Sequence, residues 1–358
     1  MEKNPFNLQF GKRPKQFLAR QDVLDTFLNS LDDMDSAEKE SLLVGIRGIG
    51  KTTLLSDIAE SMKVNKQWVV INTFASDHIT KDISDTLVYE YQKRFPKQKI
   101  SGINIGAAGI SVGLNFNNPS QKYGFATQFR ILIDAFTKED IGILFLVDEL
   151  VNVPEVRDFL SNYQILLREN KKMALLLAGL PNNVSSVLND KVLTFLWRIN
   201  RLELGAINTQ IILFSYEDIF ENFEVSAGVL EKAAKLTQGY PYLYQLIGYY
   251  LFQFASDAKR IGEKELDRAI EVAKNQLFDK VLKLMYLEMS PKDQEIFLAL
   301  GKLESPIHFS DVASQVGETK NYTAQYRLRL IELGVIREAG YGLVEFVVPF
   351  TKDFLKTL

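Results

Sequence analysis

Residues 45–53 read Gly45-Ile46-Arg47-Gly48-Ile49-Gly50-Lys51-Thr52-Thr53, which satisfies the pattern G-x-x-x-x-G-K-[ST]. Glycines at the first, fourth and sixth positions let a backbone fold closely around a phosphate without clashes of Cβ atoms. The apolar residues Leu42–Val44 before the stretch predict a strand, and Leu54–Leu55 after it open a helical pattern. Because backbone N–H groups at a helix start attract anions, the stretch predicts a phosphate site between a strand and a helix.

The polar residues of this loop are expected to have separate roles. The ammonium group of Lys51 would reach the β- and γ-phosphates, and the hydroxyl of Thr52 would ligate Mg²⁺. The residues expected to bind nucleotide from this motif are Gly45, Arg47, Gly48, Ile49, Gly50, Lys51, Thr52 and Thr53. The implied cofactors are ATP or ADP with Mg²⁺. An ordinary glycine turn is the alternative interpretation.

The second chemical signal is an apolar run that ends in two acidic residues. Ile143–Val147 predicts a buried strand, and Asp148 and Glu149 follow it directly. We expect Asp148 beside the phosphate loop, where its carboxylate would hold Mg²⁺ directly or through water. Glu149 would then polarise the attacking water as a general base. The alternative is a strand that merely ends in acidic residues.

Alternating β-rich and helical patterns over residues 17–201 predict an α/β fold. Four apolar runs are typical of strands: Leu42–Gly45, Trp68–Thr73, Ile143–Val147 and Met173–Ala178. Helical patterns follow at Thr52–Met62, Ile79–Arg94 and Asn152–Glu169. Such an alternation predicts a parallel sheet with helices on both faces. Ile100–Phe116 carries four glycines and predicts an inserted β-hairpin, either a contact element for a partner or an edge ribbon.

The rest of the chain predicts helices and then a mixed module. Helical periodicity covers Val229–Thr237, Leu243–Ala255 and Glu263–Leu284. Beyond Ser290 the pattern predicts three helices and two short strands: Lys292–Gly301, Phe309–Val316, Thr323–Leu333, Val335–Glu338 and Leu343–Val348. This is the order of a winged helix. We therefore predict an α/β domain at residues 1–201 with the hairpin at 100–116, a helical lid at 202–286 and a winged helix at 287–358.

Composition excludes several kinds of site. The 358 residues contain no cysteine and two histidines, His78 and His308, which excludes disulfides, thiolate zinc sites and a multi-histidine metal centre. No apolar run approaches the roughly 18 residues of a membrane span. The net charge is −3, so the chain lacks the overall basic excess of a dedicated nucleic-acid binder. We expect a cytoplasmic protein.

Hydrolysis usually needs a further cation near the γ-phosphate. Arg198 and Arg201, at the end of the α/β domain, are candidates for an arginine finger that acts on a neighbouring subunit. They could equally be a structural or solvated pair. Asn182 or Asn183, after the strand Met173–Ala178, is a candidate for a side chain that senses the γ-phosphate.

These motifs together resemble those of bacterial AAA+ ATPases related to origin-recognition initiators. Besides the loop and Asp148–Glu149, the resemblance rests on Asn4–Phe6, Phe10–Gly11, Phe17–Arg20, Leu177–Pro181, Phe195–Arg201, Gly239–Gly248 and Tyr326–Ile336. It implies a nucleotide pocket between the sheet domain and the lid, with Arg20 near the adenine and Tyr240 and Pro241 closing over it. Such proteins often assemble through nucleotide, so a homo-oligomer is as compatible with the resemblance as a monomeric switch.

One position departs from the initiator pattern. Initiator ATPases carry an arginine in this lid motif where this sequence has Tyr242, so one cation that would sense the γ-phosphate is missing. The Gly239-Tyr240-Pro241 form resembles instead the motif of STAND signalling ATPases, which often hold ADP and switch slowly. The resemblance therefore implies slow turnover.

The third helix of the C-terminal pattern raises the question of DNA binding. A helix with Arg327 and Arg329, followed by a glycine-tipped wing, is typical of a major-groove reader. Residues 288–358 nevertheless carry ten acidic and eight basic side chains. The two arginines also lie about 200° apart around a helix, so only one can face a groove. The expected partner is either duplex DNA, contacted through Lys320, Arg327 and Arg329, or a protein.

The sequence thus predicts a Mg²⁺-dependent ATPase that acts as a nucleotide-driven conformational switch. Glu149, Lys51, Arg198 and Arg201 are the predicted catalytic residues. Two alternatives stay open. One is a regulatory scaffold that holds nucleotide with slow or no turnover, and the other is an initiator of replication or of a mobile element.

Overall fold

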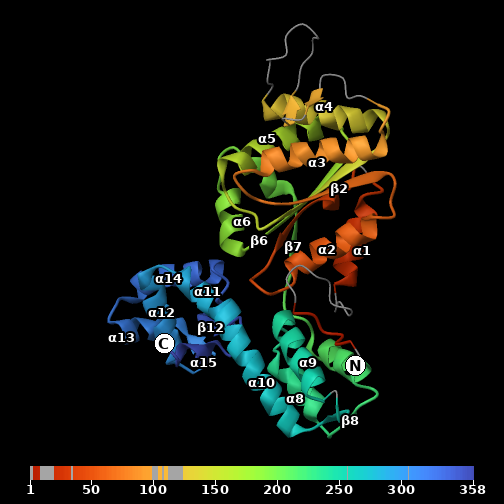
Figure 1. The fold of residues 1–358 in the computed structure, drawn as a ribbon. Helices are drawn as coiled ribbons and strands as arrows, with labels where there is room; N and C mark the ends of the chain where they lie inside the picture. The colour runs from red at the N-terminus through yellow and green to blue at the C-terminus, as the bar shows by residue number, and fades with distance from the viewer. Residues whose placement is uncertain are drawn as a thin grey trace.

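A five-stranded parallel sheet organises the first part of the chain (Figure 1). The computed structural model describes residues 3–8, 20–33, 35–98, 104–106, 109–111, 124–255, 257–304 and 306–358. The strands are β1 (Glu40–Val44), β2 (Trp68–Phe74), β5 (Gly142–Asp148), β6 (Met173–Gly179) and β7 (Asn200–Glu203). They lie in the order β2-β5-β6-β1-β7, and all neighbours are parallel. The predicted α/β fold with a parallel sheet is therefore confirmed.

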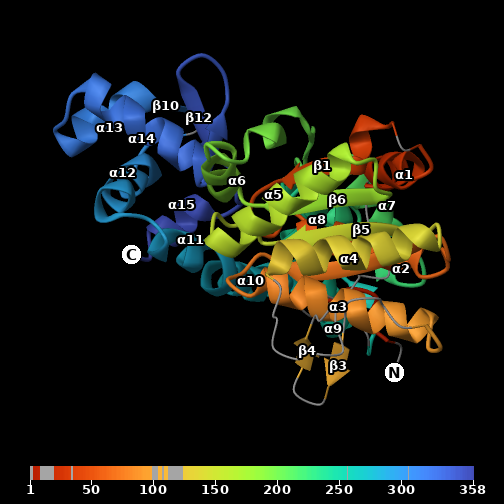
Figure 2. The ribbon, with the colours of Figure 1, turned by 90° about the horizontal axis from the view of Figure 1, so that it is seen from above.

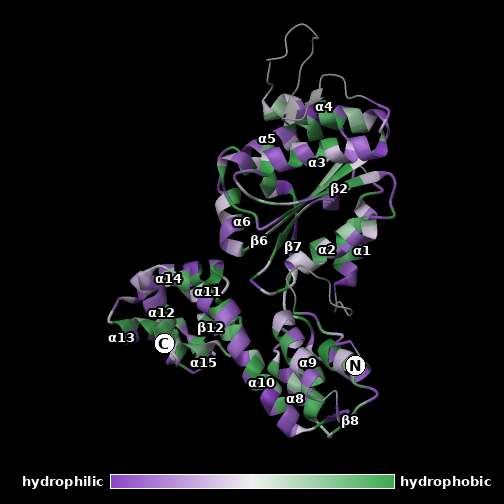
Figure 3. Ribbon diagram, in the orientation of Figure 1, coloured by the Kyte–Doolittle hydropathy of each residue, from purple (hydrophilic) through white to green (hydrophobic). Residues whose placement is uncertain are grey.

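Helices cover both faces of this sheet because its central strands are apolar on both sides. In β5, Ile143, Phe145 and Val147 pack into one core, whereas Leu144 and Leu146 pack into the other. Figure 3 shows these green strands enclosed by helices with purple outer faces. The first core is closed by α3 (Ile79–Arg94), α4 (Phe125–Lys138) and α5 (Pro154–Arg168), and the second by α1 (Gln21–Ser30) and α2 (Lys51–Met62).

The sequence patterns do not predict every element of the sheet layer. The edge strand β7 alternates between half-buried and exposed residues, so it lacks the continuous apolar run of a central strand. It also spans the predicted boundary between residues 201 and 202, and the division into three domains stays a prediction. The other elements that the patterns miss here are η1 (Ala37–Lys39), α1, α4, α6 (Pro181–Leu188) and η2 (Thr194–Arg198).

Two short strands lie within the predicted hairpin segment. β3 (Asn104–Gly106) and β4 (Gly109–Ser111) pair antiparallel, with Gly106 opposite Gly109 at the predicted turn. They form a sheet of their own, separate from the five-stranded one. The remaining residues of Ile100–Phe116 lie outside the described part of the chain.

A group of helices follows β7 and forms what we call the lid. Its helices are α7 (Thr209–Ile219), α8 (Val229–Leu236), α9 (Pro241–Ala255) and α10 (Glu263–Leu277), with the short parallel strands β8 (Glu224–Val225) and β9 (Arg260–Ile261). The N-terminal residues 3–8 also pack on the lid. Phe6 is buried against α9 at Gly248, and Asn4 donates a hydrogen bond to the carbonyl of Tyr249 at 3.0 Å.

Aromatic residues at and beside α9 contribute to the lid core. Tyr240, Tyr244 and Phe252 are buried, and the rings of Tyr216 and Tyr244 lie 5.0 Å apart. These buried rings therefore stabilise the packing of the lid helices.

A π-helical turn at Phe278–Leu282 and α11 (Lys283–Leu287) connect α10 to the last part of the chain. This part, residues 288–358, is here called the C-terminal module. Its elements are α12 (Pro291–Gly301), β10 (Ile307–His308), α13 (Phe309–Val316), α14 (Lys320–Glu332), β11 (Ile336–Glu338), β12 (Leu343–Phe346) and α15 (Thr351–Leu355). The three strands form an antiparallel sheet in the order β10-β12-β11, with β10 not predicted.

The C-terminal module is attached to both other parts of the molecule. Helix α15 packs back on the end of α10, where Lys274 and Asp353 form an ion pair at 2.5 Å and the rings of Phe278 and Phe354 lie 5.5 Å apart. Helix α14 contacts α6 of the sheet layer, and Figures 1 and 2 show this module beside α6 from two directions. Within the described ranges, no helix is long and apolar enough to cross a lipid bilayer.

Candidate functional site

The loop at residues 45–50 connects β1 to α2, which begins at Lys51. The side chain of Lys51 lies within this loop, where its Nζ donates hydrogen bonds to the carbonyls of Gly45 at 2.8 Å and Ile46 at 3.1 Å. Burial lowers the pKa of Lys51 to about 8, although the nearby carboxylate of Asp148 acts in the opposite direction. A lysine in this position holds a positive charge at neutral pH in a place with little solvent, as a phosphate site requires.

Thr52 and Asp148 meet at the carboxyl edge of the sheet. The Thr52 hydroxyl donates to Oδ2 of Asp148 at 2.6 Å, although the two residues come from α2 and β5, which lies two strands away from β1. The carboxylate of Asp148 is buried, and its other oxygen accepts the N–H of Glu149 at 2.8 Å. A hydroxyl and a carboxylate side by side are the hard oxygen donors that suit Mg²⁺. Among the described residues, no group of three or more His, Asp or Glu side chains is arranged to hold a metal ion.

Glu149 lies immediately past β5, with its side chain exposed at the same edge. Its φ of 53° is in the left-handed region, which non-glycine residues rarely adopt. The conformation is held on both sides, because the N–H of Glu149 bonds to Asp148 and the N–H of Leu150 bonds to the carbonyl of Ala178 at 2.8 Å. The strained turn separates the two carboxylates: Asp148 points inward and Glu149 faces solvent.

The lid reaches the loop through Tyr240. This residue is 2% exposed, and its hydroxyl donates to the carbonyl oxygen of Arg47 at 2.5 Å. The resemblance implies that Tyr240 and Pro241 close over the adenine. In the structure the Tyr240 hydroxyl is turned toward the loop instead, and Pro241 begins α9 as a half-buried residue.

The end of α11 and the C-terminal module also reach the loop, a contact that the sequence patterns do not predict. Arg47 and Glu288 form an ion pair at 2.7 Å. Gly334 lies against Ile46 so closely that a Cβ atom on this glycine would be 2.5 Å from Cγ2 of Ile46. No local signal marks Glu288 or Gly334, since each is an ordinary residue near a helix end. Three consecutive loop residues, 46–48, are thus contacted from the lid or from the C-terminal end of the chain.

The remaining residues of the predicted nucleotide site lie nearby or in the loop. Arg20 precedes α1, and its guanidinium donates to the carbonyl of Gly205 at 2.6 Å. It therefore joins the start of the sheet layer to the segment that enters the lid, and burial lowers its pKa. Phe10–Gly11 and Phe17–Ala19 lie outside the described residues. Asn182 and Asn183 are half-buried in the first turn of α6.

The two arginines predicted to be catalytic lie on different elements near the end of the sheet layer. Arg198 ends the short helix η2, and Arg201 lies on the edge strand β7; both are exposed. The guanidinium of Arg201 lies over the ring of Trp197 at 5.0 Å, and Trp197 is itself half exposed. Arg201 therefore lies on an edge strand of the sheet with its guanidinium stacked on Trp197, and Arg198 lies just before this strand.

The candidate DNA contacts are engaged within the C-terminal module. Arg329 pairs with the buried carboxylate of Asp293 at 2.7 Å, and Arg327 pairs with Glu338 at 3.0 Å. Lys320 is exposed at the first turn of α14. Two of the three candidate cations thus already form ion pairs with carboxylates of the same module.

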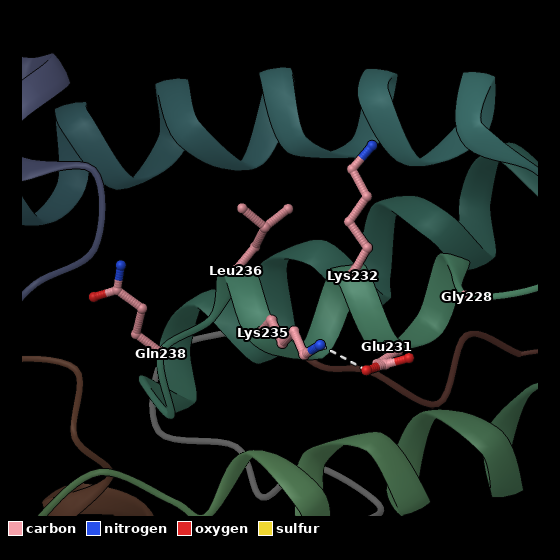
Figure 4. Close-up of a pocket in the computed structure, with 6 residues that line it drawn as sticks. All are labelled: Gly228, Glu231, Lys232, Lys235, Leu236 and Gln238. Carbon is pink, nitrogen blue, oxygen red and sulfur yellow. Dashed lines mark hydrogen bonds and ion pairs between the residues drawn. The ribbon is translucent and has the colours of Figure 1, made fainter.

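A hollow of about 360 Å³ lies on α8 of the lid, away from the loop (Figure 4). Its two lysines, Lys232 and Lys235, pair with Glu263 and Glu231 respectively. The hollow therefore presents no unpaired cation to a phosphate and contains none of the predicted site residues.

Solved structures share this fold over nearly the whole chain. The Walker-type ATPase PABY2304 of Pyrococcus abyssi is 16% identical, with a TM-score of 0.69 over 98% of this chain and 99% of that one. The ORC2 protein of Aeropyrum pernix, in its ADPNP–ADP complexes, is 13% identical, with a TM-score of 0.59 over 98% and 96%. Its ADP form is 14% identical, with a TM-score of 0.53 over 98% and 97%. At these identities the likeness shows the fold alone.

Sequence comparison adds one match. A family model described as a domain of unknown function, DUF8462, matches residues 279–355, which span α11 and the C-terminal module. Comparison with curated protein sequences gives no match.

Proposed function

We propose that this protein is an ATP-binding P-loop ATPase. The observation that carries the proposal is the meeting of Thr52 and Asp148 at the loop that holds Lys51. These are the residue types that a Mg²⁺-bound triphosphate requires, and they come from the start of α2 and the end of β5, in a fold shared with the Walker-type ATPase of Pyrococcus abyssi. The related ORC2 fold of Aeropyrum pernix was solved with ADPNP and ADP, which supports nucleotide as the ligand.

Each residue of the proposed site has its own role in binding or hydrolysing the nucleotide. Thr52 and Asp148 would hold Mg²⁺, which when bound neutralises phosphate charge. Lys51 binds and orients the phosphates, and the N–H groups of residues 47–53 surround them at the start of α2. Glu149, exposed at the same edge, accepts a proton from the water that attacks the γ-phosphate.

We also propose that nucleotide drives a conformational switch. The support is the set of contacts on loop residues 46–48, which join this loop to the lid through Tyr240 and to the C-terminal module through Glu288 and Gly334. Phosphate binding requires the loop to adopt one particular conformation. Any adjustment of these three residues therefore changes the contacts that hold the other two parts of the molecule.

A regulatory protein that turns over slowly is the second candidate. The lid presents the hydroxyl of Tyr240 to the loop rather than a cation, and Arg47 is paired with Glu288. Fast hydrolysis would then need a cation from a second molecule, a role open to Arg198 or Arg201 in an oligomer.

For the C-terminal module, which we interpret as a winged helix, we propose a protein partner rather than duplex DNA. The ion pairs of Arg327 and Arg329 leave the third helix with little charge for phosphate contacts. Leu328 on this helix and Tyr341 between Gly340 and Gly342 are instead well exposed. Retardation of duplex DNA at low salt that is lost with R327A/R329A would contradict this choice and favour an initiator.

The Glu149→Gln variant tests the proposed ATPase. Replacing the proton acceptor by an amide should lower the rate of phosphate release by about 10²- to 10⁴-fold while ATP still binds. Phosphate release is measured at saturating Mg-ATP, and binding is measured by calorimetry. Glu139→Gln is the control, because Glu139 is also exposed but lies before β5, at the opposite end of that strand from Asp148.

Two results would decide against the proposal in different ways. If the unchanged protein bound neither Mg-ATP nor Mg-ADP, the nucleotide site itself would be refuted. If it bound both but released no phosphate above background, the regulatory protein without turnover would replace the ATPase.

A further inference from the structure

The hydrogen bond from Tyr240 to Arg47 acts on a peptide group inside the phosphate loop. The carbonyl that accepts it belongs to the peptide between Arg47 and Gly48. In a trans peptide the C=O and the following N–H point in opposite directions and rotate together. A partner that holds the Arg47 carbonyl toward the lid therefore holds the N–H of Gly48 away from the lid.

The absence of a side chain at Gly48 allows the Tyr240 hydroxyl to come this close to the loop. Its φ of 76° lies in the left-handed region, and a Cβ atom at this position would lie 2.2 Å from the Tyr240 hydroxyl. The glycine thus serves two purposes, since it adopts the loop conformation and leaves room for the phenol. Tyr242 also approaches Gly48, but through its Cβ atom and not through its hydroxyl.

The lid holds Tyr240 firmly. Its N–H donates to the carbonyl of Thr237 at 2.8 Å, and the preceding Gly239 carbonyl accepts the N–H of Ile207 at 2.8 Å. The ring is buried, and burial raises the pKa of the phenol, so the hydroxyl stays protonated and remains a donor. A hydroxyl without a partner in such a place is unfavourable, which keeps it on the Arg47 carbonyl.

We propose that Tyr240 is a positioning residue for nucleotide: its hydroxyl fixes the Arg47–Gly48 peptide so that the Gly48 N–H is presented to a bound phosphate. Because the tyrosine moves with the lid, the position of the lid sets the orientation of this one peptide. The inference rests on the proposed nucleotide binding and adds a residue that the phosphate-loop motif does not contain.

The chain allows this peptide to be observed by itself. Arg47–Gly48 is the only Arg–Gly step in the 358 residues. Protein labelled with ¹³C at arginine carbonyls and with ¹⁵N at glycine amides therefore gives a single carbonyl–amide correlation signal in NMR, from this peptide alone. The signal reports the hydrogen bond on the carbonyl and the surroundings of the N–H together.

The experiment compares Tyr240→Phe with Tyr242→Phe, each with and without ADP. In the Tyr240 variant we expect the signal to move in the nucleotide-free protein and the dissociation constants of ADP and ATP to rise about fivefold to tenfold, the usual effect of one lost hydrogen bond. The Tyr242 variant should keep the signal and the affinity of the unchanged protein. A role in lid packing alone would lower the melting temperature without moving the signal.

Unchanged affinity and an unmoved signal in Tyr240→Phe would overturn the inference while leaving the proposed function intact. If that variant did not fold, the unchanged protein still decides, because ADP must shift the Gly48 signal strongly; a signal insensitive to saturating ADP would refute the inference. If the unchanged protein bound no nucleotide, the proposed function would fail first, so the two failures are distinguishable.

Discussion

At the scale of single residues, the charge of Lys51 depends strongly on its surroundings. Burial lowers its pKa from 10.5 to about 8, so in the nucleotide-free protein half of this charge is lost near pH 8. Bound phosphates favour the protonated ammonium and raise this pKa again. Affinity for nucleotide should therefore be greatest well below pH 8 and should decrease as the pH rises through it.

We expect the dissociation constant of ADP to increase about eightfold between pH 7.5 and 9.0. Over this interval the protonated fraction of a group with a pKa near 8 falls from about three quarters to about one tenth. Calorimetry in EDTA measures this without competition from metal ions. Lys51→Arg keeps its charge throughout and should have a flat profile. A flat profile for the unchanged protein would mean that Lys51 does not contact the phosphates.

At the scale of elements, the attachment of residues 3–8 to the lid includes one very close contact, between Phe6 and Gly248. A Cβ atom on Gly248 of α9 would lie 2.2 Å from the ring of Phe6, and the phenyl ring is surrounded by Tyr216, Phe220 and Tyr244. The ring cannot move aside without disturbing this aromatic cluster. The contact therefore joins the N-terminal segment to the lid rather than to the sheet.

Gly248→Ala should destabilise the protein by about 1–3 kcal/mol, the usual effect of overpacking a buried contact. Denaturation by urea measures this free energy of unfolding. Gly205→Ala is the control, because a Cβ atom there meets nothing within 4 Å. Combining Gly248→Ala with Phe6→Leu should recover part of the loss. Equal effects of the alanines at 248 and 205 would contradict the packing argument.

At the scale of the whole molecule, the contact between Gly334 and Ile46 brings the C-terminal module against the phosphate loop. The ion pair of Arg47 and Glu288 beside it is exposed on both sides, so it contributes little by itself. Close packing at Gly334 is the contact that a single substitution can remove.

We expect Gly334→Ala to release the C-terminal module from the loop. The matched control is Gly317→Ala, because the two glycines have φ values of 71° and 68° but only Gly334 has a neighbour within 4 Å. Both variants carry the same backbone strain, so the difference between them reports the contact with Ile46. Hydrogen exchange at residues 44–50 should become faster in Gly334→Ala alone, and small-angle scattering should show a larger radius. Identical behaviour of both variants would argue against the contact.

The sequence by itself determined the features that depend on residues adjacent in the chain. Strand, loop and helix follow one another through residues 40–62 because the apolar run, the glycines and the helix start are adjacent in the chain. Asp148 at the end of β5 and helix Phe309–Val316 were predictable for the same reason. The edge strand β7 was not, since exposed edge residues lack an apolar run.

Only the tertiary structure decided what surrounds the phosphate loop. Tyr240 meets Arg47 across 193 residues, and Glu288 meets the same arginine across 241. Periodicity and motifs report the local environment, whereas these contacts depend on how the lid and the C-terminal module pack on the sheet. The same packing paired Arg327 and Arg329 with carboxylates, which the sequence pattern of this helix does not predict.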